Sequence, residues 1–395
     1  MKILVINTGS SSVKFTLYET VQEALLGKGL IDRIGSANAK LYYTNNRHQT
    51  IKKPIQANSY ESAISQACLM LADKETGVIS HYSEIDGIGH RVVHGGSEIS
   101  GAVRITGAIK QVILDCFSLA PLHNPPNLEG IKACERLFPD IPMVAVFDTA
   151  FHHTISPAAY TYAIPRDVAT KNKIRRYGFH GTSHHYVAMA TAHLLGKPLS
   201  ALKLITAHLG NGCSITAVDH GKVVDTSMGF TPLEGLVMGT RCGDIDPAVV
   251  LFLIQHGYSP GEVDKLLNKK SGLLGLSGIN SNDMRDILNA VKKGNEQAKL
   301  TLGVFIHRLV KYIGAYAAIL NGFDALIFTA GIGENAPIIR TLVCNKLTFL
   351  GIHLDEEHNE TNQKIISRAG ISPTVLVIPT NEELLIARET VRILS

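Results

Sequence analysis

A short turn near the start of the sequence gathers groups that bind phosphate. Asn7-Thr8-Gly9-Ser10-Ser11-Ser12 is followed by Val13-Lys14, which places backbone N–H groups, hydroxyls and one ammonium within eight residues. Amides and hydroxyls can donate to phosphate oxygens while Lys14 neutralises their charge. The turn is not a GxxxxGK[ST] loop and leads into a second strand rather than a helix, which disfavours a P-loop protein. A serine-rich hairpin turn without a ligand is the alternative.

Two later segments repeat this arrangement of small residues after an apolar run. HLGNGCS at 208–214 has two glycines around Asn211, and FTAGIGENAP at 328–337 has the pattern GxGxN. Pro337 is suited to the first turn of a following helix. One GxG pattern is weak evidence, but three such turns, each after a predicted strand, indicate a binding site for a phosphorylated ligand.

Two arginines and one aspartate stand beside these segments. Arg91 lies in GHRVVHGG, Arg241 in MGTRCGDIDP, and Asp148 ends the apolar run MVAVFD. The guanidinium fork binds carboxylate or phosphoryl oxygens in a bidentate manner, and site residues often follow the carboxyl ends of strands. A structural ion pair for either arginine, and a helix cap or turn for Asp148, are the alternatives.

Two of the 17 histidines lie among glycine, proline and aromatic residues: His123 in APLHNPPN and His180 in YGFHGTSHH. Either imidazole could stabilise a transferring phosphoryl group or orient an acid. The HxxxHH spacing also suggests a metal site, but no HExxH motif and no carboxylate at ligand spacing accompanies it, so a histidine metal site is disfavoured.

Short buried strands and intervening helices must position these residues. Apolar runs at 2–7, 85–90, 143–148, 202–210, 325–331 and 374–379 predict strands, and helical patterns cover 62–71, 128–138, 184–195 and 295–320. The alternation indicates an α/β chain. KILVINTGSSSVKFTLYE from Lys2 and LKLITAHLGNGCSITAVD from Leu202 also resemble each other when Gly9 is set against Gly210, which suggests two copies of one sheet unit.

Length and composition limit the class of protein. A chain of 395 residues is expected to form two domains around a cleft. The second sheet unit places their boundary near residue 150, after FDTAFHHTISP, where Pro157 breaks regularity. The net charge of +4 is dispersed, which argues against nucleic-acid binding, and six scattered cysteines indicate neither a zinc site nor disulfides. We see no leader and no apolar stretch approaching the roughly 20 residues that span a bilayer, so we expect a cytoplasmic enzyme without membrane attachment.

The segments together resemble a known family. LVINTGSSSVKF, GHRVVHGG, APLHNPPN, FDTAFH, RRYGFHGTSHHYV, HLGNGCS, DTSMGFTPLEGLVMGTRCGDIDP, GINSNDMRD, GIGENAP and PTNEELLIA resemble, in order and over nearly the whole chain, the acetate kinases of bacteria and some archaea. The resemblance implies the duplicated actin-like and sugar-kinase (ribonuclease H-like) fold and a homodimer. It implies domains at 1–150 and 151–382, with a helix at about 383–395 packed back on the first. The activity implied is reversible, direct in-line phosphoryl transfer between ATP and acetate, giving ADP and acetyl phosphate.

The resemblance also implies a role for each site residue. It places Mg²⁺, with Mn²⁺ as an alternative, at Asn7 and Glu382. It places ATP or ADP at Ser10, Ser12, Lys14, His208, Leu209, Gly210, Asn211, Gly212, Asp283, Met284, Arg285, Gly331, Ile332, Gly333, Glu334 and Asn335. The implied catalytic residues are Asp148, His180 and Arg241. The implied acetate site comprises Arg91, His123, Val93, Leu122, Phe179 and Pro232.

Some alternatives stay open at this point. Met284 stands where the family usually has an aromatic residue, although Met can still cover an adenine face. Glu383 adjoins Glu382 and is an alternative metal ligand. Acetate is already ionised at neutral pH, so we expect Asp148 to orient ligands rather than move a proton. A propionate or butyrate kinase would keep nearly every motif, and an actin-like ATP switch without enzymatic activity is a more distant alternative.

Overall fold

A computed structural model describes residues 1–395, which divide into two compact units. Unit 1 comprises residues 1–153 and 381–395, and unit 2 comprises residues 154–380. The chain therefore passes from one unit to the other twice, after His153 and after Thr380. The C-terminal helix belongs to the unit that also contains the N-terminus.

Unit 1 is built on an eight-stranded sheet in the order β5-β4-β3-β2-β1-β6-β8-β7. Strand β1 runs antiparallel to β2 and parallel to β6, and β6 runs parallel to β8. The strands are β1 (Lys2–Thr8), β2 (Ser12–Glu19), β3 (Ala24–Asp32), β4 (Lys40–Asn45), β5 (Thr50–Pro54), β6 (Gly87–Val92), β7 (Val103–Arg104) and β8 (Met143–Phe147).

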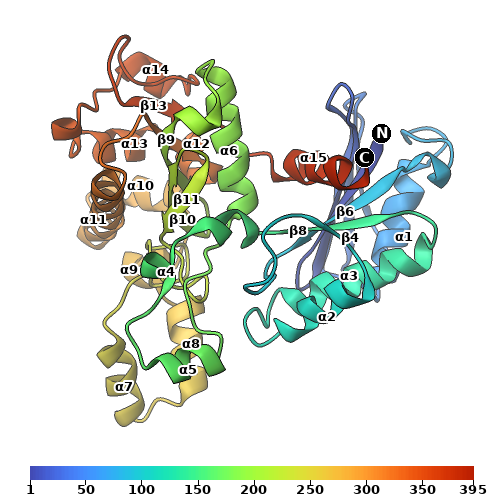
Figure 1. The fold of residues 1–395 in the computed structure, drawn as a ribbon, viewed down its shortest axis with the longest axis horizontal. Coiled ribbons are helices and arrows are strands. Elements are labelled where there is room, and N and C mark those ends of the chain that lie inside the picture. The colour runs from blue at the N-terminus through green and yellow to red at the C-terminus, as the bar shows by residue number, and fades with distance from the viewer. The chain divides into compact units, whose positions relative to one another are not determined.

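Helices pack against both faces of this sheet (Figure 1). They are α1 (Tyr60–Leu71), α2 (Gly107–Asp115), α3 (Asn124–Leu137) and α15 (Glu382–Leu394). Helix α15 contacts β1, β6 and β8, while α3 contacts β1 and β6 from the side of the core that holds Leu4 and Ile6. A strand buried on both faces needs apolar side chains at consecutive positions, which explains the continuous run in β1. Gly89 lets α15 pack closely against β6, because a Cβ at this position would lie 2.4 Å from Thr390 Oγ1.

Unit 2 contains a five-stranded sheet in the order β11-β10-β9-β12-β13. Strand β9 is antiparallel to β10 and parallel to β12, which is parallel to β13. The strands are β9 (Lys203–Leu209), β10 (Cys213–Asp219), β11 (Lys222–Thr226), β12 (Ala325–Thr329) and β13 (Thr374–Val377).

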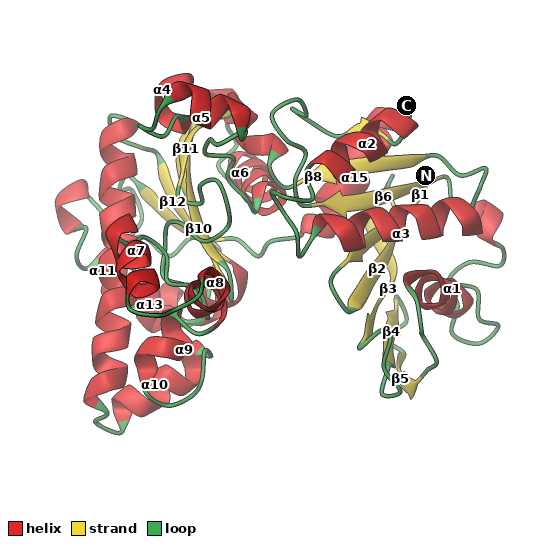
Figure 2. Cartoon of the chain, turned by 90° about the horizontal axis from the view of Figure 1, so that it is seen from below, coloured by secondary structure: helices red, strands yellow, loops and turns green.

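The helices of unit 2 also cover both faces of its sheet, with α6 on one side and α11 on the other (Figure 2). They are α4 (Pro157–Tyr160), α5 (Arg166–Lys171), α6 (Gly181–Leu194), α7 (Pro247–Gln255), α8 (Pro260–Lys269), α9 (Gly272–Ser277), α10 (Met284–Lys292), α11 (Glu296–Ile319), α12 (Ala330–Asn335), α13 (Pro337–Cys344) and α14 (Glu356–Glu360).

The two sheets share one topology. The order β3-β2-β1-β6-β8 in unit 1 matches β11-β10-β9-β12-β13 in unit 2, including which neighbours are parallel. The β1–β2 turn at Gly9 corresponds to the β9–β10 turn at Gly210, and each of these glycine N–H groups donates within its turn. The structure therefore contains the two copies of one sheet unit that the sequence suggested.

The segment 330–335 differs from the expected turn. It forms the short helix α12, which begins after Thr329 and places the Glu334 carboxylate 2.7 Å from the Ala330 N–H. That bond satisfies one of the N–H groups left unpaired at a helix start. The glycines therefore lie in a helical turn, and Pro337 begins the next helix, α13, as predicted.

Helix α11 is long and apolar enough to cross a membrane by length and composition alone. This finding differs from the sequence prediction that no apolar stretch approaches membrane-spanning length. The helix contacts β9, β10, α9, α10 and α13, and its side chains Phe305, Ile306, Leu309 and Ile313 are buried within unit 2. A core helix of this kind meets the same length and hydropathy criteria.

Candidate active site

The parallel strands of unit 1 bring three predicted residues to one edge of the sheet. Strands β1, β6 and β8 are parallel neighbours, so their carboxyl ends meet at the same edge. Asn7 lies at the end of β1, Arg91 at the end of β6, and Asp148 directly after β8. The N-terminus of α15 adds Glu382, whose carboxylate lies 3.6 Å from Arg91 Nε.

Arg91 and Asp148 form the central ion pair of this edge. Arg91 Nη2 donates to Asp148 Oδ2 at 2.5 Å, and Arg91 Nε donates to Oδ1 at 3.2 Å. Burial would lower the pKa of the Arg91 guanidinium, but the charges of Asp148 and Glu382 outweigh it and raise that pKa. Asp148 is 1% exposed, whereas Arg91 retains partial exposure and can meet a ligand.

The segment from Asn7 to Lys14, which we call the phosphate-type turn, connects β1 to β2. Asn7 and Lys14 are paired opposite each other in the antiparallel register, and the Gly9 N–H closes the turn on the Ser12 carbonyl at 2.8 Å. Ser10 and Lys14 are exposed, and Ser12 is partly buried. Paired residues of two strands project to the same face, so the turn presents the Asn7 amide and the Lys14 ammonium on one side.

Two asparagines hold the ends of the strands in place, although sequence analysis did not identify them as site residues. Asn127 on α3 accepts from the Val93 N–H at 3.1 Å and donates to the Thr8 carbonyl at 2.8 Å. Asn124 accepts from the His94 N–H at 3.0 Å. His123 precedes them as the partly buried N-cap residue of α3. Both asparagines lie in the motif APLHNPPN, and buried asparagines must find hydrogen-bond partners. These partners lie about 30 and 120 residues away in sequence, so the motif alone does not identify them.

Unit 2 contains a cavity that gathers three predicted segments. Its volume is about 610 Å³. Residues from the β9–β10 turn, the start of α10 and the α12–α13 region surround it: Gly210, Asn211, Asn282, Asp283, Met284, Arg285, Leu288, Gly331, Ile332, Asn335, Ala336, Pro337 and Ile338. Its size suits a drug-sized ligand. Of the predicted residues in these segments, His208, Leu209, Gly212, Gly333 and Glu334 do not line it.

Met284 and Arg285 take different places at this cavity. Met284 is 4% exposed, whereas the Arg285 side chain is exposed and pairs with Asp283 at 2.5 Å. Asp283 also caps α10 by accepting from the Arg285 N–H. Asn282 donates to Asn211 Oδ1 at 2.8 Å, which ties the start of α10 to the β9–β10 turn.

Three buried side chains, His184, His208 and Ser214, form a cluster with the partly buried His180 beside the β9–β10 turn. Ser214 Oγ lies 2.9 Å from His180 Nδ1 and 2.7 Å from His184 Nε2. The rings of His180 and His208 stack with centroids 4.2 Å apart. His180 adopts φ 57°, in the left-handed region that is uncommon for a residue with a side chain, so surrounding contacts hold this conformation. Ser214 ends the HLGNGCS segment and His184 belongs to the HxxxHH spacing, but neither motif indicated that these two side chains meet.

Gly212 allows His180 and Arg241 to approach the β9–β10 turn. A Cβ on Gly212 would lie 3.2 Å from His180 Cε1 and 3.5 Å from Arg241 Nη1. Arg241 Nη1 lies 3.4 Å from the Pro232 carbonyl, and burial lowers the pKa of its guanidinium from the ordinary arginine value. The structure therefore brings together three residues predicted in separate motifs.

Partly buried ion pairs fix the loop that carries Arg241. Arg176 donates to Glu234 at 2.6 Å and to the Thr226 carbonyl at 2.9 Å. Arg308 pairs with Asp244 at 3.0 Å, and Asp244 accepts from the Gly235 N–H at 2.9 Å. Sequence analysis missed these residues because an isolated arginine or carboxylate does not reveal its partner.

The four apolar residues predicted for the acyl pocket differ in burial. Val93 is 7% exposed and Phe179 is 2% exposed, whereas Leu122 is 57% exposed and Pro232 is partly buried. Val93 and Leu122 belong to unit 1, while Phe179 and Pro232 belong to unit 2.

The duplicated fold and the charged and phosphate-binding groups described above define a class of protein, a phosphotransferase built from two copies of one sheet unit. Comparisons with known proteins agree. The model of the acetokinase family matches residues 2–388. An acetate kinase from Heliobacterium modesticaldum is 51% identical over 397 aligned positions, covering 100% of both chains. The chain belongs to the acetokinase family.

Solved structures confirm the predicted fold class. An acetate kinase from Porphyromonas gingivalis matches with a TM-score of 0.96 at 44% identity, covering 100% of both chains. A propionate kinase from Francisella tularensis subsp. tularensis matches with a TM-score of 0.93 at 44% identity, covering 99% of each. Both have the actin-like and sugar-kinase fold.

Proposed function

We propose that this chain catalyses reversible, magnesium-dependent phosphoryl transfer between ATP and acetate. The observation that carries the proposal is the cavity of unit 2, where the three segments predicted to bind nucleotide surround one volume. The Arg91–Asp148–Glu382 cluster of unit 1 supports the second half of the reaction, because it presents a partly exposed guanidinium to a small anion. The name of the relative from Heliobacterium modesticaldum supports acetate as that anion.

The mechanism follows from the charges that must meet. The transferring phosphoryl group carries negative charge on its equatorial oxygens, and the attacking acetate is itself an anion. Arg91 binds and orients the carboxylate, while Arg241 and His180 donate to the phosphoryl oxygens as charge spreads in the transition state. Ser10, Ser12 and Lys14 hold the other phosphates. Acetate needs no deprotonation at neutral pH, so Asp148 orients Arg91 rather than accepting a proton.

The residues of unit 1 fit magnesium carried by the nucleotide. Asn7 and Glu382 offer the amide and carboxylate oxygens that Mg²⁺ prefers, and Mg²⁺ keeps several waters when it bridges protein and phosphates. The structure has no group of three or more His, Cys, Asp and Glu side chains that could form a protein-only metal site. When bound, Mg²⁺ would neutralise charge on the phosphates. Mn²⁺ has similar ligand preferences, and Glu383 is the alternative ligand beside Glu382.

A hydroxamate assay for acyl phosphate tests the proposal. Purified protein is incubated with MgATP and acetate, propionate or butyrate in parallel, and kcat/KM is measured for each acid. Turnover that is fastest with acetate supports the proposal. Absence of product with all three acids would refute it and favour a switch that binds ATP without acyl transfer.

Propionate is the second candidate substrate because the fold does not separate the two activities. The propionate kinase from Francisella tularensis subsp. tularensis is as identical to this chain as the acetate kinase from Porphyromonas gingivalis. Val93, buried two residues after Arg91, is the residue we propose as the wall beside the acyl methyl. One methylene in an apolar pocket is worth about 1–3 kcal/mol, so Val93→Ala should raise the propionate-to-acetate ratio of kcat/KM by roughly tenfold. Leu137→Ala, which truncates a partly buried side chain packed against the core of unit 1, should leave the ratio unchanged.

A homodimer is the proposed assembly, with a contact surface on α7. This helix has the sequence PAVVLFLIQ and no buried residue, and Leu251 and Phe252 are 61% and 56% exposed. An apolar helix face of this kind marks an interaction surface. Light scattering should give twice the chain mass, and Leu251→Asp with Phe252→Asp should give a monomer, whereas the paired change Leu114→Asp and Leu122→Asp should not. We expect the dimer to be cytoplasmic.

A further inference from the structure

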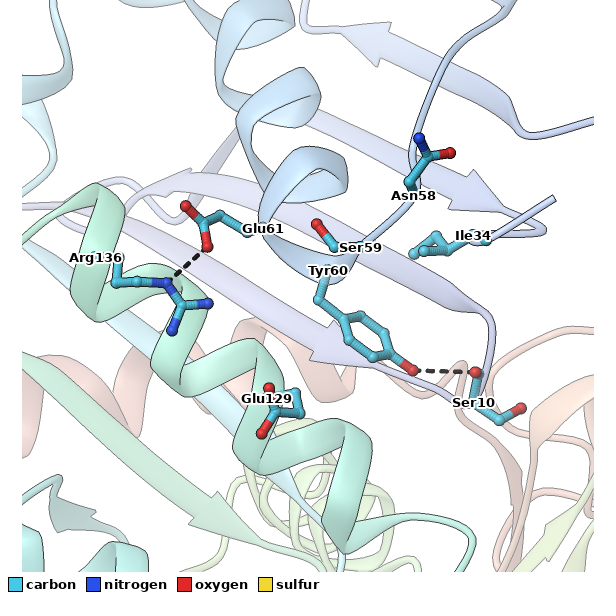
Figure 3. A pocket seen from close by; sticks show the side chains of 9 residues that line it. Ser10, Ile34, Asn58, Ser59, Tyr60, Glu61, Glu129 and Arg136 are labelled. Atoms are coloured by element: carbon cyan, nitrogen blue, oxygen red, sulfur yellow. Dashed lines mark hydrogen bonds and ion pairs between the residues drawn. The ribbon is translucent and has the colours of Figure 1, made fainter. Parts of the chain in front are cut away.

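The hydroxyl of Tyr60 contacts the phosphate-type turn from outside. Tyr60 Oη donates to the Gly9 carbonyl at 2.7 Å and lies 3.0 Å from the Ser10 carbonyl. Figure 3 shows the ring extending from the start of α1 to Ser10, beside a cavity of about 330 Å³. One phenol group thus holds two consecutive carbonyls of the turn to which we assign phosphate binding.

These two contacts set the direction of the next two amides. In a trans peptide the C=O and N–H groups point in opposite directions because the unit is planar. When the carbonyls of Gly9 and Ser10 point to Tyr60, the N–H groups of Ser10 and Ser11 therefore point away from it. Neither amide donates within the protein, and both residues are exposed. Two consecutive N–H groups directed to one side form a nest that binds anions.

The position of Tyr60 is itself fixed. It is the first residue of α1, whose N-terminus is closed by the capping box of Ser59 and Ser62. Glu61, the next residue, forms an ion pair with Arg136 on α3 at 2.6 Å. Burial, followed by the charge of Glu129, raises the pKa of the Tyr60 hydroxyl, which keeps its proton available for donation.

We propose that Tyr60 is a positioning residue for phosphoryl transfer, which directs the Ser10 and Ser11 amides toward the phosphates of the bound nucleotide. The inference rests on the proposed function, because it needs phosphates at this turn. It adds a residue outside every motif considered above, and it acts through the backbone rather than by touching the ligand.

Tyr60→Phe tests this role by removing the hydroxyl and keeping the ring. Tyr43→Phe is the matched control, because Tyr43 is buried in the same unit and also donates one hydroxyl bond to a carbonyl, that of Thr76 at 3.2 Å. Acyl phosphate formation is measured with each substrate varied in turn. Binding of adenosine and of MgATP is then titrated separately, because adenosine lacks the phosphates.

Tyr60→Phe should lower kcat/KM for ATP by about tenfold. The reason is that the Ser10 and Ser11 amides lose their fixed direction, a loss comparable to that of roughly one hydrogen bond. The KM for acetate and the Kd for adenosine should not change, whereas MgATP binding should weaken. Tyr43→Phe should leave all four values near those of the wild type. Equal behaviour of the two variants, or equal loss of adenosine and MgATP binding by Tyr60→Phe, would overturn the inference. A wild type without acyl phosphate formation would instead refute the proposed function.

Discussion

Arg91 and Asp148 share two hydrogen bonds across the ends of neighbouring parallel strands, with Nη2 to Oδ2 at 2.5 Å and Nε to Oδ1 at 3.2 Å. The pair occupies one edge of the guanidinium fork, so the carboxylate of a substrate must meet the remaining N–H groups. Glu382, 3.6 Å from Arg91 Nε, further limits the free directions. Both acidic residues thus orient the arginine to which we assign acetate.

Arg91→Lys should separate charge from geometry. Lysine keeps one positive charge near Asp148 but lacks the planar fork, so the buried carboxylate stays compensated while the substrate loses its bidentate donor. Loss of one oriented donor commonly lowers kcat by about 10²–10³. Steady-state kinetics and circular dichroism measure activity and folding. Arg136→Lys, which changes the surface ion pair with Glu61, should stay near wild type. Normal kcat in folded Arg91→Lys would contradict the assignment.

Glu382→Gln and Glu383→Gln form a matched pair for the metal assignment. Each change removes one charge from the first turn of α15 and keeps the shape of the side chain. Loss of a group that orients a metal or its waters commonly weakens metal binding by about 10–100-fold. The Mg²⁺ concentration for half-maximal rate should therefore rise by that factor in Glu382→Gln and much less in Glu383→Gln. The reverse order would assign the metal to Glu383.

Ser214→Ala should disturb His180 without touching a ligand. Ser214 bridges the His180 and His184 rings, so its removal leaves two ring nitrogens without this partner. Loss of one hydrogen bond costs about 0.5–1.5 kcal/mol, and a His180 ring without its Ser214 contact should lower kcat more than it raises the KM for ATP. Ser367→Ala removes another buried serine of unit 2, which accepts from the Val375 N–H at 3.1 Å. If both variants lose stability but neither loses kcat, Ser214 has only a structural role.

Acid should destabilise unit 1 through a buried histidine. Burial lowers the pKa of His90 from 6.5 to about 3, and His90 Nε2 has no hydrogen-bond partner. Between pH 6.5 and pH 3 the unfolded chain binds a proton at His90 that the folded chain does not bind. The free energy of unfolding is therefore unaffected by His90 well above pH 6.5 and decreases as the pH falls below it. From pH 6.5 to pH 5 the loss is about 2 kcal/mol for one such group.

His90→Leu should reduce this dependence. Thermal unfolding midpoints are compared at pH 7 and pH 5, and the difference between the two should be smaller in His90→Leu than in the wild type. His48→Asn, which changes an exposed histidine of the same unit, should keep the wild-type difference. An unchanged difference in His90→Leu would show that His90 does not contribute to acid destabilisation.

Much of the fold could be predicted because its signals are local. The apolar runs predicted as strands form β1, β6, β8, β9, β12 and β13, and the predicted helical patterns lie in α1, α3, α6 and α11. The resemblance between the segments starting at Lys2 and Leu202 corresponds to the shared strand order of the two sheets. The helix α12 was not expected, because its Ala330 N–H is satisfied by the Glu334 side chain, which glycine spacing does not reveal.

The site residues divide in the same way between local and distant causes. The turn from Asn7 to Lys14 is visible in the sequence because all its groups lie within one hairpin. The partners of Tyr60, Asn127 and Ser214 were not visible, because each acts on a residue of another element: Gly9, Thr8 and His180. Leu122 was predicted in an apolar wall but is 57% exposed, and its role stays a prediction.

The sequence by itself determined the α/β class, the duplicated unit and the family, since hydrophobic period and ordered motifs are properties of neighbouring residues. Only the tertiary structure decided which charges meet. Arg91 and Asp148 are 57 residues apart, yet the parallel pairing of β6 and β8 brings their side chains into contact. The cavity of unit 2 likewise combines turns separated by long stretches of chain. Burial then selects their partners, because a charge removed from water requires a compensating group at hydrogen-bond distance.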